Sequence, residues 1–428
     1  MKKRKIAFQT FGCKLNFAET STISRSFSKE EFEPVSFKEK ADIYVIHSCA
    51  VTANAERKTR AAIRHAKRQN PKASVAVIGC YAQLQPQLLM NMEEVDIVMG
   101  NREKYRLPGF YYNNTLEKFM DVDATNIMKE TSYQGAFSSG DRTRSFLKIQ
   151  DGCDYFCSYC IIPYTRGRSR SISIDEILGT AQEIARSDIK EVTLTGVNIG
   201  DFGKNNDESF FELIQALDKV DGIERYRISS IEPDLLTPQI IDFVAASNKF
   251  LPHFHIPLQS GNNDILKRMN RKYTRELFAE HIDKINATLP HACIAVDLIV
   301  GFPGETETQF KETAAFIQSL PISYLHVFPF SLRPNTKAEN MKNQIPVEIK
   351  KQRSEVMHHI SDRMKEDFLR SQQGKKRHVL WESNPDGSYM QGWTENYIKV
   401  KKPYQENLVN TIEPVSLDVL KDGYYLIE

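Results

Sequence analysis

Six of the seven cysteines in this 428-residue sequence fall into two sets of three. The tighter set is Cys153, Cys157 and Cys160, which the segment DGCDYFCSYC spaces as C-x3-C-x2-C. Three thiolates on one short loop can hold three irons of a 4Fe-4S cluster and leave the fourth iron open to another ligand. Zinc is the alternative, but a closed zinc site needs four ligands, and no fourth Cys or His lies nearby in the sequence.

The other three cysteines each follow a short apolar run in the first hundred residues. The runs KIAFQTFGC, DIYVIHSC and SVAVIGC end at Cys13, Cys49 and Cys80. Segments with a helical pattern follow the first two cysteines, at 16–29 and 54–70. Strands that alternate with helices predict a parallel sheet, whose carboxyl strand ends form the usual ligand-binding edge. We therefore expect the three cysteines to meet there, with three buried packing cysteines as the alternative.

The rest of the chain predicts two further domains. Six apolar runs between residues 145 and 330 alternate with helical segments, one of them 264–289, which is typical of an incomplete (β/α)6 barrel. A long polar helix after Pro346 leads to a tail of short apolar runs, which predicts a small antiparallel β-barrel. The expected α/β architecture is an N-terminal open parallel sheet domain (1–130), a Ser- and Gly-rich linker (131–143), the barrel (144–370) and the tail domain (371–428).

The composition is that of an ordinary globular protein. Hydrophobic residues make up 41% and charged residues 26%, and the mean hydropathy is −0.45, which excludes disordered, collagen-like and membrane classes. The basic N-terminus lacks the apolar core of a secretory signal. The formal net charge of +2 is too small to indicate a polyanionic partner by itself. We expect a cytoplasmic protein without membrane contact, whose cysteines are ligands rather than disulfides.

Taken together, the cysteine motifs resemble those of one enzyme family. The triplet with Tyr159 before its last cysteine is similar to the radical S-adenosylmethionine (SAM) signature. The motifs GCKLN, HSCAVT, GCYAQ and CSYCIIPYTRGRSRS resemble the methylthiotransferases of that superfamily. Stretches such as LTGVNIGDFG, HIPLQSGNNDILKRMNRKY and DLIVGFPGET extend the resemblance over nearly the whole chain. In the tail, GWTENYIKV looks like a TRAM domain, a small RNA-binding barrel.

The resemblance implies two 4Fe-4S clusters, one on each cysteine set, with SAM as the other cofactor. Sulfur on the open iron of the N-terminal cluster would be methylated by one SAM, while a second SAM supplies the radical that abstracts an unreactive C–H hydrogen. All six cysteines would then be metal ligands and catalytic residues. Family positions at the barrel strand ends imply SAM contacts, for which ordinary turn and cap chemistry is the alternative: Gly196, Asn198, Ser230, Glu232 and Gln259.

Local basic and aromatic clusters indicate where RNA would bind. Spacing by three or four puts four basic side chains on one face of the 54–70 helix, a stripe suited to phosphates or simply to solvent. Two arginines follow the radical triplet, and two tail aromatics interleave with lysines in a pattern that suits stacking on unpaired bases. The expected RNA contacts are Arg57, Arg60, Arg64, Lys67, Arg166, Arg168, Trp393 and Tyr397.

Three substrates compete within the family: isopentenyladenosine in tRNA, threonylcarbamoyladenosine in tRNA, and an aspartate of a small-subunit ribosomal protein. Lys14 in GCKLN and the run LHVFPFS look most like the threonylcarbamoyladenosine group. The hypothesis is therefore addition of a methylthio group to C2 of that adenosine at position 37, beside the anticodon. The partners would be the tRNA anticodon stem-loop, an electron-donating reductase or flavodoxin, and a sulfur donor.

Two other classes of function stay open. An RNA-binding protein with structural clusters would cleave no SAM, although structural clusters usually have four ligands. A radical-SAM methyltransferase is the nearer alternative, and the three N-terminal cysteines distinguish the two. Cys293 has no partner cysteine and is expected to be a buried packing residue. Asn335 stands where the family usually has glycine, and asparagine tolerates the same left-handed turn.

Overall fold

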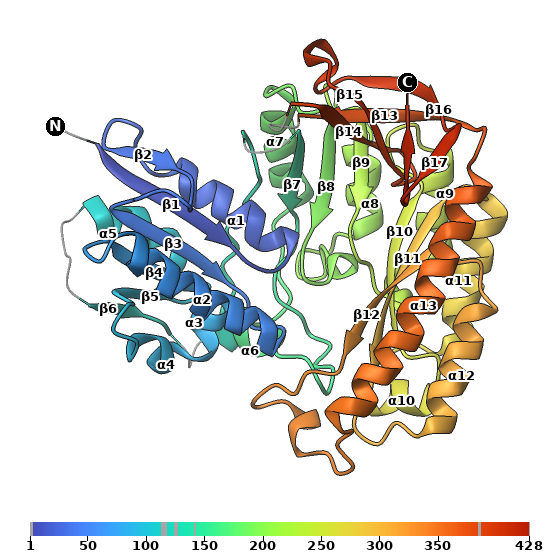
Figure 1. Cartoon of the computed structure of the whole chain (residues 1–428), viewed down its shortest axis with the longest axis horizontal. Helices are drawn as coiled ribbons and strands as arrows, with labels where there is room; N and C mark the ends of the chain where they lie inside the picture. The colour runs from blue at the N-terminus through green and yellow to red at the C-terminus, as the bar shows by residue number, and fades with distance from the viewer. Residues whose placement is uncertain (1–2, 113–117, 124–126, 141–142, 384–386, 428) are drawn as a thin grey trace. The chain divides into compact units, whose positions relative to one another are not determined.

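The computed structural model describes residues 3–112, 118–123, 127–140, 143–383 and 387–427, which divide into two compact units (Figure 1). The first unit comprises Met1–Asp141, Phe146–Ser171 and Ser331–Glu339, and the second comprises Arg142–Ser145, Ile172–Phe330 and Asn340–Glu428. Residues 141 and 142 of the predicted linker lie outside the described residues. In the described ranges, no helix combines the length and the apolar character that a membrane crossing requires. Both cysteine sets belong to the first unit.

The first unit is built on a six-stranded parallel sheet with the order β2-β1-β3-β4-β5-β6. Its strands are β1 (Arg4–Thr10), β2 (Phe32–Val35), β3 (Ile43–Ser48), β4 (Ser74–Gly79), β5 (Ile97–Met99) and β6 (Phe119–Asp121). Its helices are α1 (Lys14–Arg25), α2 (Ala53–Gln69), α3 (Cys80–Leu84), α4 (Pro86–Met90), α5 (Leu107–Tyr112) and α6 (Ile162–Arg166). The sequence did not predict the edge strand β2, because Pro34 interrupts its apolar pattern, and an edge is where a strand tolerates proline.

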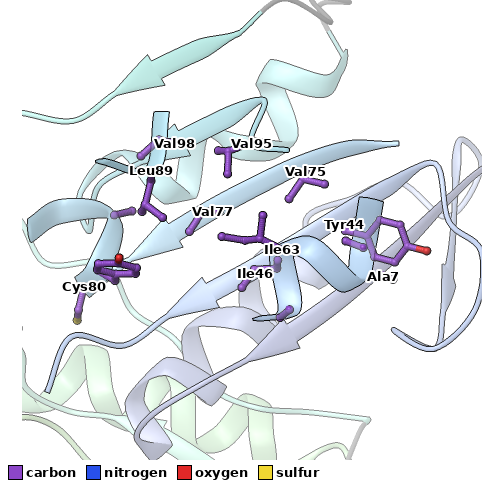
Figure 2. Packing of buried hydrophobic residues seen from close by; sticks show 14 of the residues in the cluster. Ala7, Tyr44, Ile46, Ile63, Val75, Val77, Cys80, Leu89, Val95 and Val98 are labelled. Carbon is purple, nitrogen blue, oxygen red and sulfur yellow. The ribbon is translucent and has the colours of Figure 1, made fainter. Parts of the chain in front are cut away.

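Two hydrophobic cores cover the two faces of this sheet. On one face Ile78 packs in the same cluster as Ile23 of α1, and on the other Val77 packs with Ile63 of α2 (Figure 2). Burial on both faces explains why these strands read as nearly continuous apolar runs. Cys80 lies at one end of the second core, where β4 stops (Figure 2).

The second unit holds the C-terminal tail, the strands that follow the radical triplet, and the start of β7, which precedes the triplet. Its helices are α7 (Ile174–Ala185), α8 (Phe210–Leu217), α9 (Pro238–Ala246), α10 (Asn263–Arg268), α11 (Arg275–Thr288), α12 (Glu307–Gln318) and α13 (Val347–Ser371). One sheet has the order β7-β8-β9, from β7 (Arg144–Lys148), which runs on into the first unit, β8 (Glu191–Thr195) and β9 (Arg225–Ile228). The next has the order β10-β11-β12, from β10 (His253–Gln259), β11 (Cys293–Val300) and β12 (Tyr324–Pro329).

Isolated parallel bridges connect these two sheets. One joins Tyr226 to Phe250 and the other joins Ser230 to His255. The pairs β8–β9, β10–β11 and β11–β12 are all parallel. Figure 1 shows α11, α12 and α13 along one side of β10, β11 and β12. The predicted alternation of parallel strands and helices is therefore confirmed.

The single helix expected over 264–289 is wrong, because the chain forms two helices there. Asn270 has a φ of 60°, a left-handed conformation that ends the helical run after α10. Thr274 then starts α11 by accepting a hydrogen bond from the Leu277 backbone N–H at 3.4 Å. Two expectations about single residues are confirmed: Cys293 is buried in β11, and Asn335 has a φ of 64°.

The C-terminal tail forms a mixed sheet, and the expectation of purely antiparallel pairing is corrected. Its strands are β13 (Lys376–Glu382), β14 (Tyr389–Thr394), β15 (Lys399–Pro403), β16 (Ile412–Ser416), β17 (Val419–Lys421) and β18 (Tyr424–Leu426), in the order β16-β13-β14-β15-β18-β17. β15 pairs with β18 in parallel, whereas the other pairs are antiparallel. The difference arises because the chain crosses to β16 at the far edge before the β17–β18 hairpin returns to β15.

A buried charge cluster connects the cysteine-bearing segments of the first unit. Glu19 of α1 contacts Arg166 of α6 at 2.9 Å, and it also contacts Lys104 at 2.5 Å and Lys148 at 3.0 Å. None of these four residues is more than 2% exposed. The members of the buried charge cluster are Glu19, Lys104, Lys148, Asp151, Arg166 and Arg170.

Asp151 is the second acid of the buried charge cluster. It contacts Lys148 at 2.8 Å, Arg166 at 2.9 Å and Arg170 at 3.2 Å. Burial by itself would raise the pKa of both acids. Arg166, Lys104 and Lys148 instead hold the pKa of Glu19 well below its usual range, and the cations around Asp151 lower its pKa in the same way. Both carboxylates therefore stay ionised inside the protein.

Replacing Glu19 tests how much the first unit depends on this cluster. Glu19→Gln leaves three buried cations without one of their counter-charges, so we expect the free energy of unfolding of this unit to fall by about 3–5 kcal/mol. Amide hydrogen exchange in β1, β3 and β4 measures this quantity. Glu33→Gln is a control on exposed edge strand β2 and should change the value by less than about 0.5 kcal/mol. Equal effects of the two substitutions would contradict the prediction.

The lowered acid pKa values also predict a sensitivity to acid. Unfolded Glu and Asp titrate near pH 4, at about 4.3 and 3.9. The pKa values of Glu19 and Asp151 are lower in the folded protein. The two ionised carboxylates therefore stabilise the fold fully above about pH 5, and this stabilisation is lost as the pH falls through the folded pKa values. Urea titrations at several pH values, followed by near-UV circular dichroism, measure the free energy of unfolding. Below pH 5 this free energy should fall less in Glu19→Gln than in wild type. Parallel pH profiles for wild type and variant would refute this.

Candidate functional site

Each cysteine of the N-terminal set follows one of three neighbouring parallel strands. Cys13 is the N-cap of α1 after β1, Cys49 directly follows β3, and Cys80 begins α3 after β4. The strand order β1-β3-β4 places these ends side by side, with Ser48 opposite Gly79 in the register. The structure thus has the arrangement expected from the three apolar runs.

The three thiols lie close enough to influence one another. Gly12 has a φ of +103°, and a Cβ at this position would lie 3.0 Å from the Cys49 Sγ, so glycine provides the necessary space. Burial raises the pKa of the Cys49 thiol to about 12, and the nearby thiols of Cys80 and Cys13 add to the rise. Because iron binds thiolates, loading a cluster here must release these protons.

Two asparagines and one arginine surround the N-terminal thiols. Asn101 Nδ2 donates to Cys80 Sγ at 3.4 Å and to a carbonyl of α6 at 2.8 Å. Asn16 Oδ1 lies 3.7 Å from the Cys13 Sγ and accepts a hydrogen bond of 2.7 Å from Arg166. Such groups fix the orientation of metal-binding side chains and balance their charge.

Sequence reasoning missed both asparagines as site residues. The signal was present, because Asn16 ends the motif GCKLN and Asn101 ends the apolar run VDIVMGN. Neither residue type is a preferred ligand of iron–sulfur clusters, so a search for ligands passes over them. Their importance becomes visible only from their contacts.

The second cysteine set occupies the loop between β7 and α6. An antiparallel bridge between Asp151 and Arg170 closes the base of this loop. Gly152 has a φ of +70°, and a Cβ there would lie 1.9 Å from the Arg168 carbonyl oxygen. A larger residue at position 152 is therefore excluded on both conformational and steric grounds.

Backbone hydrogen bonds shape the loop around the triplet. The Cys153 N–H donates to the carbonyl of Gly167 at 3.0 Å, and the Cys160 N–H donates to the carbonyl of Cys157 at 3.0 Å. Cys157 is buried, whereas Cys153 and Cys160 are partly exposed. The loop thus presents three thiols from a fixed backbone, with access to the set from outside.

The three thiols of each cysteine set could each bind one iron of a 4Fe-4S cluster and leave the fourth iron open. The choice between such a cluster and zinc stays a prediction.

The local charge also fits an iron–sulfur cluster. The buried charge cluster pairs four basic side chains with two acidic ones. Arg166, at its centre, interacts electrostatically with the thiol of Cys80. A cluster held by thiolates is anionic, so an excess of buried positive charge beside it is favourable.

The expected SAM contacts lie at the ends of β8, β9 and β10 or directly after them. Asn198 is buried after β8 and donates to Asp201 Oδ2 at 3.1 Å, and Glu232 after β9 forms an ion pair with Arg271. Gln259 ends β10 with a φ of 64°, and its buried Oε1 has no hydrogen-bond partner among the described residues. An orphaned buried oxygen is expected where a polar ligand binds. Gly196 follows β8 and Ser230 follows β9 in the same way.

The predicted basic stripe on α2 is only partly available to RNA. Arg57 and Arg64 are exposed. Arg60 donates to the Tyr81 hydroxyl at 2.7 Å, and Lys67 forms an ion pair with Asp96 at 2.9 Å, so these two side chains bind within the unit. Arg57 and Arg64 therefore remain the candidates of this stripe.

Arg166 is not an RNA contact, and this expectation is corrected. The residue is 1% exposed, and both Glu19 and Asp151 hold its guanidinium inside the first unit. Its neighbour Arg168 is exposed, with its guanidinium over the Phe156 ring at 4.9 Å. Arg166 is the last residue of α6, whereas Arg168 follows Gly167, which has a φ of +79° and ends the helix. The two arginines therefore face different surroundings, a difference that sequence spacing does not reveal.

The two tail aromatics also pack against the protein itself. Trp393 and Tyr397 stack on each other with ring centroids 4.6 Å apart. Tyr397 further contacts His253 at 4.5 Å and lies under Arg227 at 4.8 Å. These contacts occupy part of each ring, while both residues stay partly exposed, so stacking on bases stays a prediction.

Comparison with known proteins agrees with the cysteine motifs. Residues 147–317 match the radical SAM superfamily, and residues 5–100 match the uncharacterized protein family UPF0004. The fold is similar to that of the radical S-adenosylmethionine methyltransferase TsrM from Kitasatospora setae, with a TM-score of 0.56 and 13% identity over 76% of this chain and 73% of that one. At this identity the likeness concerns the fold alone.

Sequence relatives cover almost the whole chain. It is 39% identical to the threonylcarbamoyladenosine tRNA methylthiotransferase MtaB of Bacillus subtilis, over 98% of this chain and 94% of the relative. The corresponding enzyme of Aquifex aeolicus is 39% identical over 93% of this chain and 96% of its own length. The tRNA-2-methylthio-N(6)-dimethylallyladenosine synthase of Alkaliphilus oremlandii is 33% identical over 97% and 90%. The chain therefore belongs to the radical-SAM tRNA methylthiotransferases, a family whose cofactors are SAM and 4Fe-4S clusters.

Proposed function

We propose that this enzyme adds a methylthio group to C2 of N6-threonylcarbamoyladenosine at position 37 of tRNA. The observation that carries the proposal is the similarity to relatives named for that nucleoside, over nearly the full length of both chains. Lys14 and the run LHVFPFS support the same substrate. The alternatives are isopentenyladenosine, the modification in the name of a 33% identical relative, and a ribosomal-protein aspartate.

Each cysteine set would hold one 4Fe-4S cluster with an open iron, and the reaction would use two SAM molecules. When bound, these cofactors supply the one-electron chemistry that breaks an unreactive C–H bond and delivers the methylthio group. The aromatic C–H carbon has no acidic proton, so the protein needs no general base at this position. Its own task is to hold the ligands in place. Support comes from Asn16 and Asn101, which orient thiols of the N-terminal set, and from Arg166, which balances charge.

SAM would lie at the carboxyl ends of β8, β9 and β10. The orphaned Gln259 oxygen supports this position, together with the neighbouring strand-end residues Gly196, Asn198, Ser230 and Glu232. The strands β7 to β12 would form a partial (β/α)6 barrel, and the tail would be a TRAM-like domain. The proposed domains are 1–130, a linker 131–143, 144–370 and 371–428.

The anticodon stem-loop of tRNA would bind through exposed basic side chains. Arg57, Arg64 and Arg168 meet this requirement. A cytoplasmic reductase or flavodoxin would supply electrons, and a separate donor would supply sulfur. A cytoplasmic location goes with a tRNA substrate.

Iron content tests the division between the two cysteine sets. After anaerobic reconstitution we expect about eight irons per wild-type chain, and about four in the triple variant Cys153→Ala, Cys157→Ala, Cys160→Ala. Cys293→Ala is the matched control, since this cysteine is buried in β11, and it should keep about eight irons. If wild type instead bound about four irons and the triple variant none, the N-terminal cysteines would hold no cluster.

The nature of the substrate can be tested directly. Reconstituted enzyme is incubated with SAM, a reductant and tRNA that carries either threonylcarbamoyl or isopentenyl adenosine, and the digested nucleosides are quantified by mass spectrometry. We expect kcat/KM to favour the threonylcarbamoyl tRNA by at least about a hundredfold, because a site built for polar groups rejects an apolar analogue. Preferential modification of the isopentenyl tRNA would overturn the assignment.

A further inference from the structure

Side chains alternate between the two faces of the sheet β10-β11-β12. Apolar residues such as Ile256 and Val296 are fully buried on one face. The opposite face carries His255, Asp297 and His326, one from each strand, together with His253 and Gln259 of β10. We call His255, Asp297 and His326 the polar triad.

The members of the polar triad lie within contact distance of one another. Asp297 is directly opposite His326 in the register of β11 and β12. The His255 Nε2 lies 2.7 Å from the Asp297 Oδ1, and the two imidazole rings have centroids 5.2 Å apart. The polar atoms of all three side chains fall within 4.8 Å of one another. One small polar group can therefore contact all three.

The polar triad is open, unlike the charged residues of the neighbouring strands. Arg227 of β9 contacts Glu191 of β8 at 3.1 Å and a tail carbonyl at 3.2 Å, and both residues are at most 1% exposed. In contrast, His326 is exposed, and the side chains of His255 and Asp297 are 20% and 19% exposed. Such partial exposure leaves the triad accessible to a ligand.

The triad also lies near the proposed SAM position. Gln259 follows His255 by four residues on β10, a distance of about 13 Å along a strand. A substrate bound at the triad could therefore present its adenine toward SAM. Because the triad lies about 13 Å along the strand from the proposed SAM position, it suits a contact to the group attached to the adenine rather than to the carbon that reacts.

The triad offers both acceptors and a donor. An ionised carboxylate can only accept, so the His255 Nε2 donates to Asp297, and the remaining lone pairs of Asp297 are free in principle to accept from N–H or O–H groups. His326 carries at least one N–H at any protonation state of the ring. A matching ligand has N–H or O–H groups next to a carbonyl or carboxylate oxygen. The threonylcarbamoyl group has all of these, whereas an isopentenyl group has none.

We infer that the polar triad binds the threonylcarbamoyl group of the substrate, with Asp297 accepting from its N–H or O–H groups and His326 donating to its carboxylate. This inference rests on the proposed function and names the residues that select its substrate. An isopentenyl group offers the triad no hydrogen-bond partner of its own, which disfavours the wrong tRNA. A divalent metal ion is the other possible occupant, and binding it would require the His255 nitrogen that faces Asp297 to lose its hydrogen.

Binding of synthetic anticodon stem-loops tests the inference. The RNAs carry threonylcarbamoyladenosine or unmodified adenosine at position 37, and fluorescence anisotropy with reconstituted enzyme and SAM gives the ratio of the two dissociation constants. Wild type should prefer the modified RNA by about tenfold or more, and His326→Leu should bring the ratio close to one. His326→Gln keeps an N–H donor and should retain most of the preference. His358→Leu, on an exposed position of α13, is the matched control and should keep the wild-type ratio.

The outcomes separate the inference from the function on which it rests. An unchanged ratio in both His326→Leu and Asp297→Asn, with wild type still preferring the modified RNA, overturns the triad alone. Absence of any preference in wild type overturns the triad and counts against the proposed substrate. Stoichiometric Zn²⁺ binding that His326→Leu abolishes, without a change in the RNA ratio, would assign the triad to a metal ion instead. Thermal unfolding midpoints close to wild type show that each variant is folded.

Discussion

The buried contact between Glu19 and Arg166 is the constraint on which the arrangement of the candidate site depends. Glu19 belongs to the helix that Cys13 caps, and Arg166 ends the helix that follows the radical triplet. Neither charge is accessible to water, so each needs the other in place, and burying one alone would cost several kcal/mol. The pairing therefore fixes the two cysteine-bearing segments within one compact unit.

The N-terminal sheet brings together three cysteines that are far apart in the sequence. Parallel strands that are buried on both faces end at a common edge, and each of β1, β3 and β4 ends one or a few residues before a cysteine. The close approach at this edge requires Gly12, and hydrogen bonds from Asn16 and Asn101 complete the surroundings. The polar residues at the site thus serve the thiols rather than RNA.

The second unit uses its parallel strands in a different way. Along its strands, buried apolar side chains alternate with positions that include polar side chains. Some of these polar groups are satisfied, as Arg227 is by an ion pair with Glu191 and by hydrogen bonds to tail carbonyls. Others differ: the Gln259 Oε1 has no hydrogen-bond partner among the described residues, and the side chains of the polar triad are partly exposed. This contrast between satisfied and accessible polar groups is what distinguishes structural from candidate binding residues on one face.

The sequence by itself determined the features that depend on local pattern and spacing. The cysteine triplet, the three apolar runs that end at cysteines and the strand–helix alternation were all readable, because ligand spacing and side-chain periodicity act over a few residues. Family membership followed from the same motifs. The interruption of the expected 264–289 helix at Asn270 could not be predicted from the sequence, because asparagine is compatible with both a helix and a left-handed turn.

Only the tertiary structure decided which polar residues are buried and what they contact. Arg166 and Arg168 are two residues apart in one basic motif, yet the first lies inside a charge cluster and the second is exposed. Trp393 and Tyr397 have the sequence pattern of a base-stacking surface, but their rings pack on each other and on His253. The polar triad, likewise, comes from three strands spread over about seventy residues. The physical reason is that charge pairing, ring stacking and shared hydrogen bonds depend on distances between segments remote in the sequence, and only the packing of those segments sets such distances.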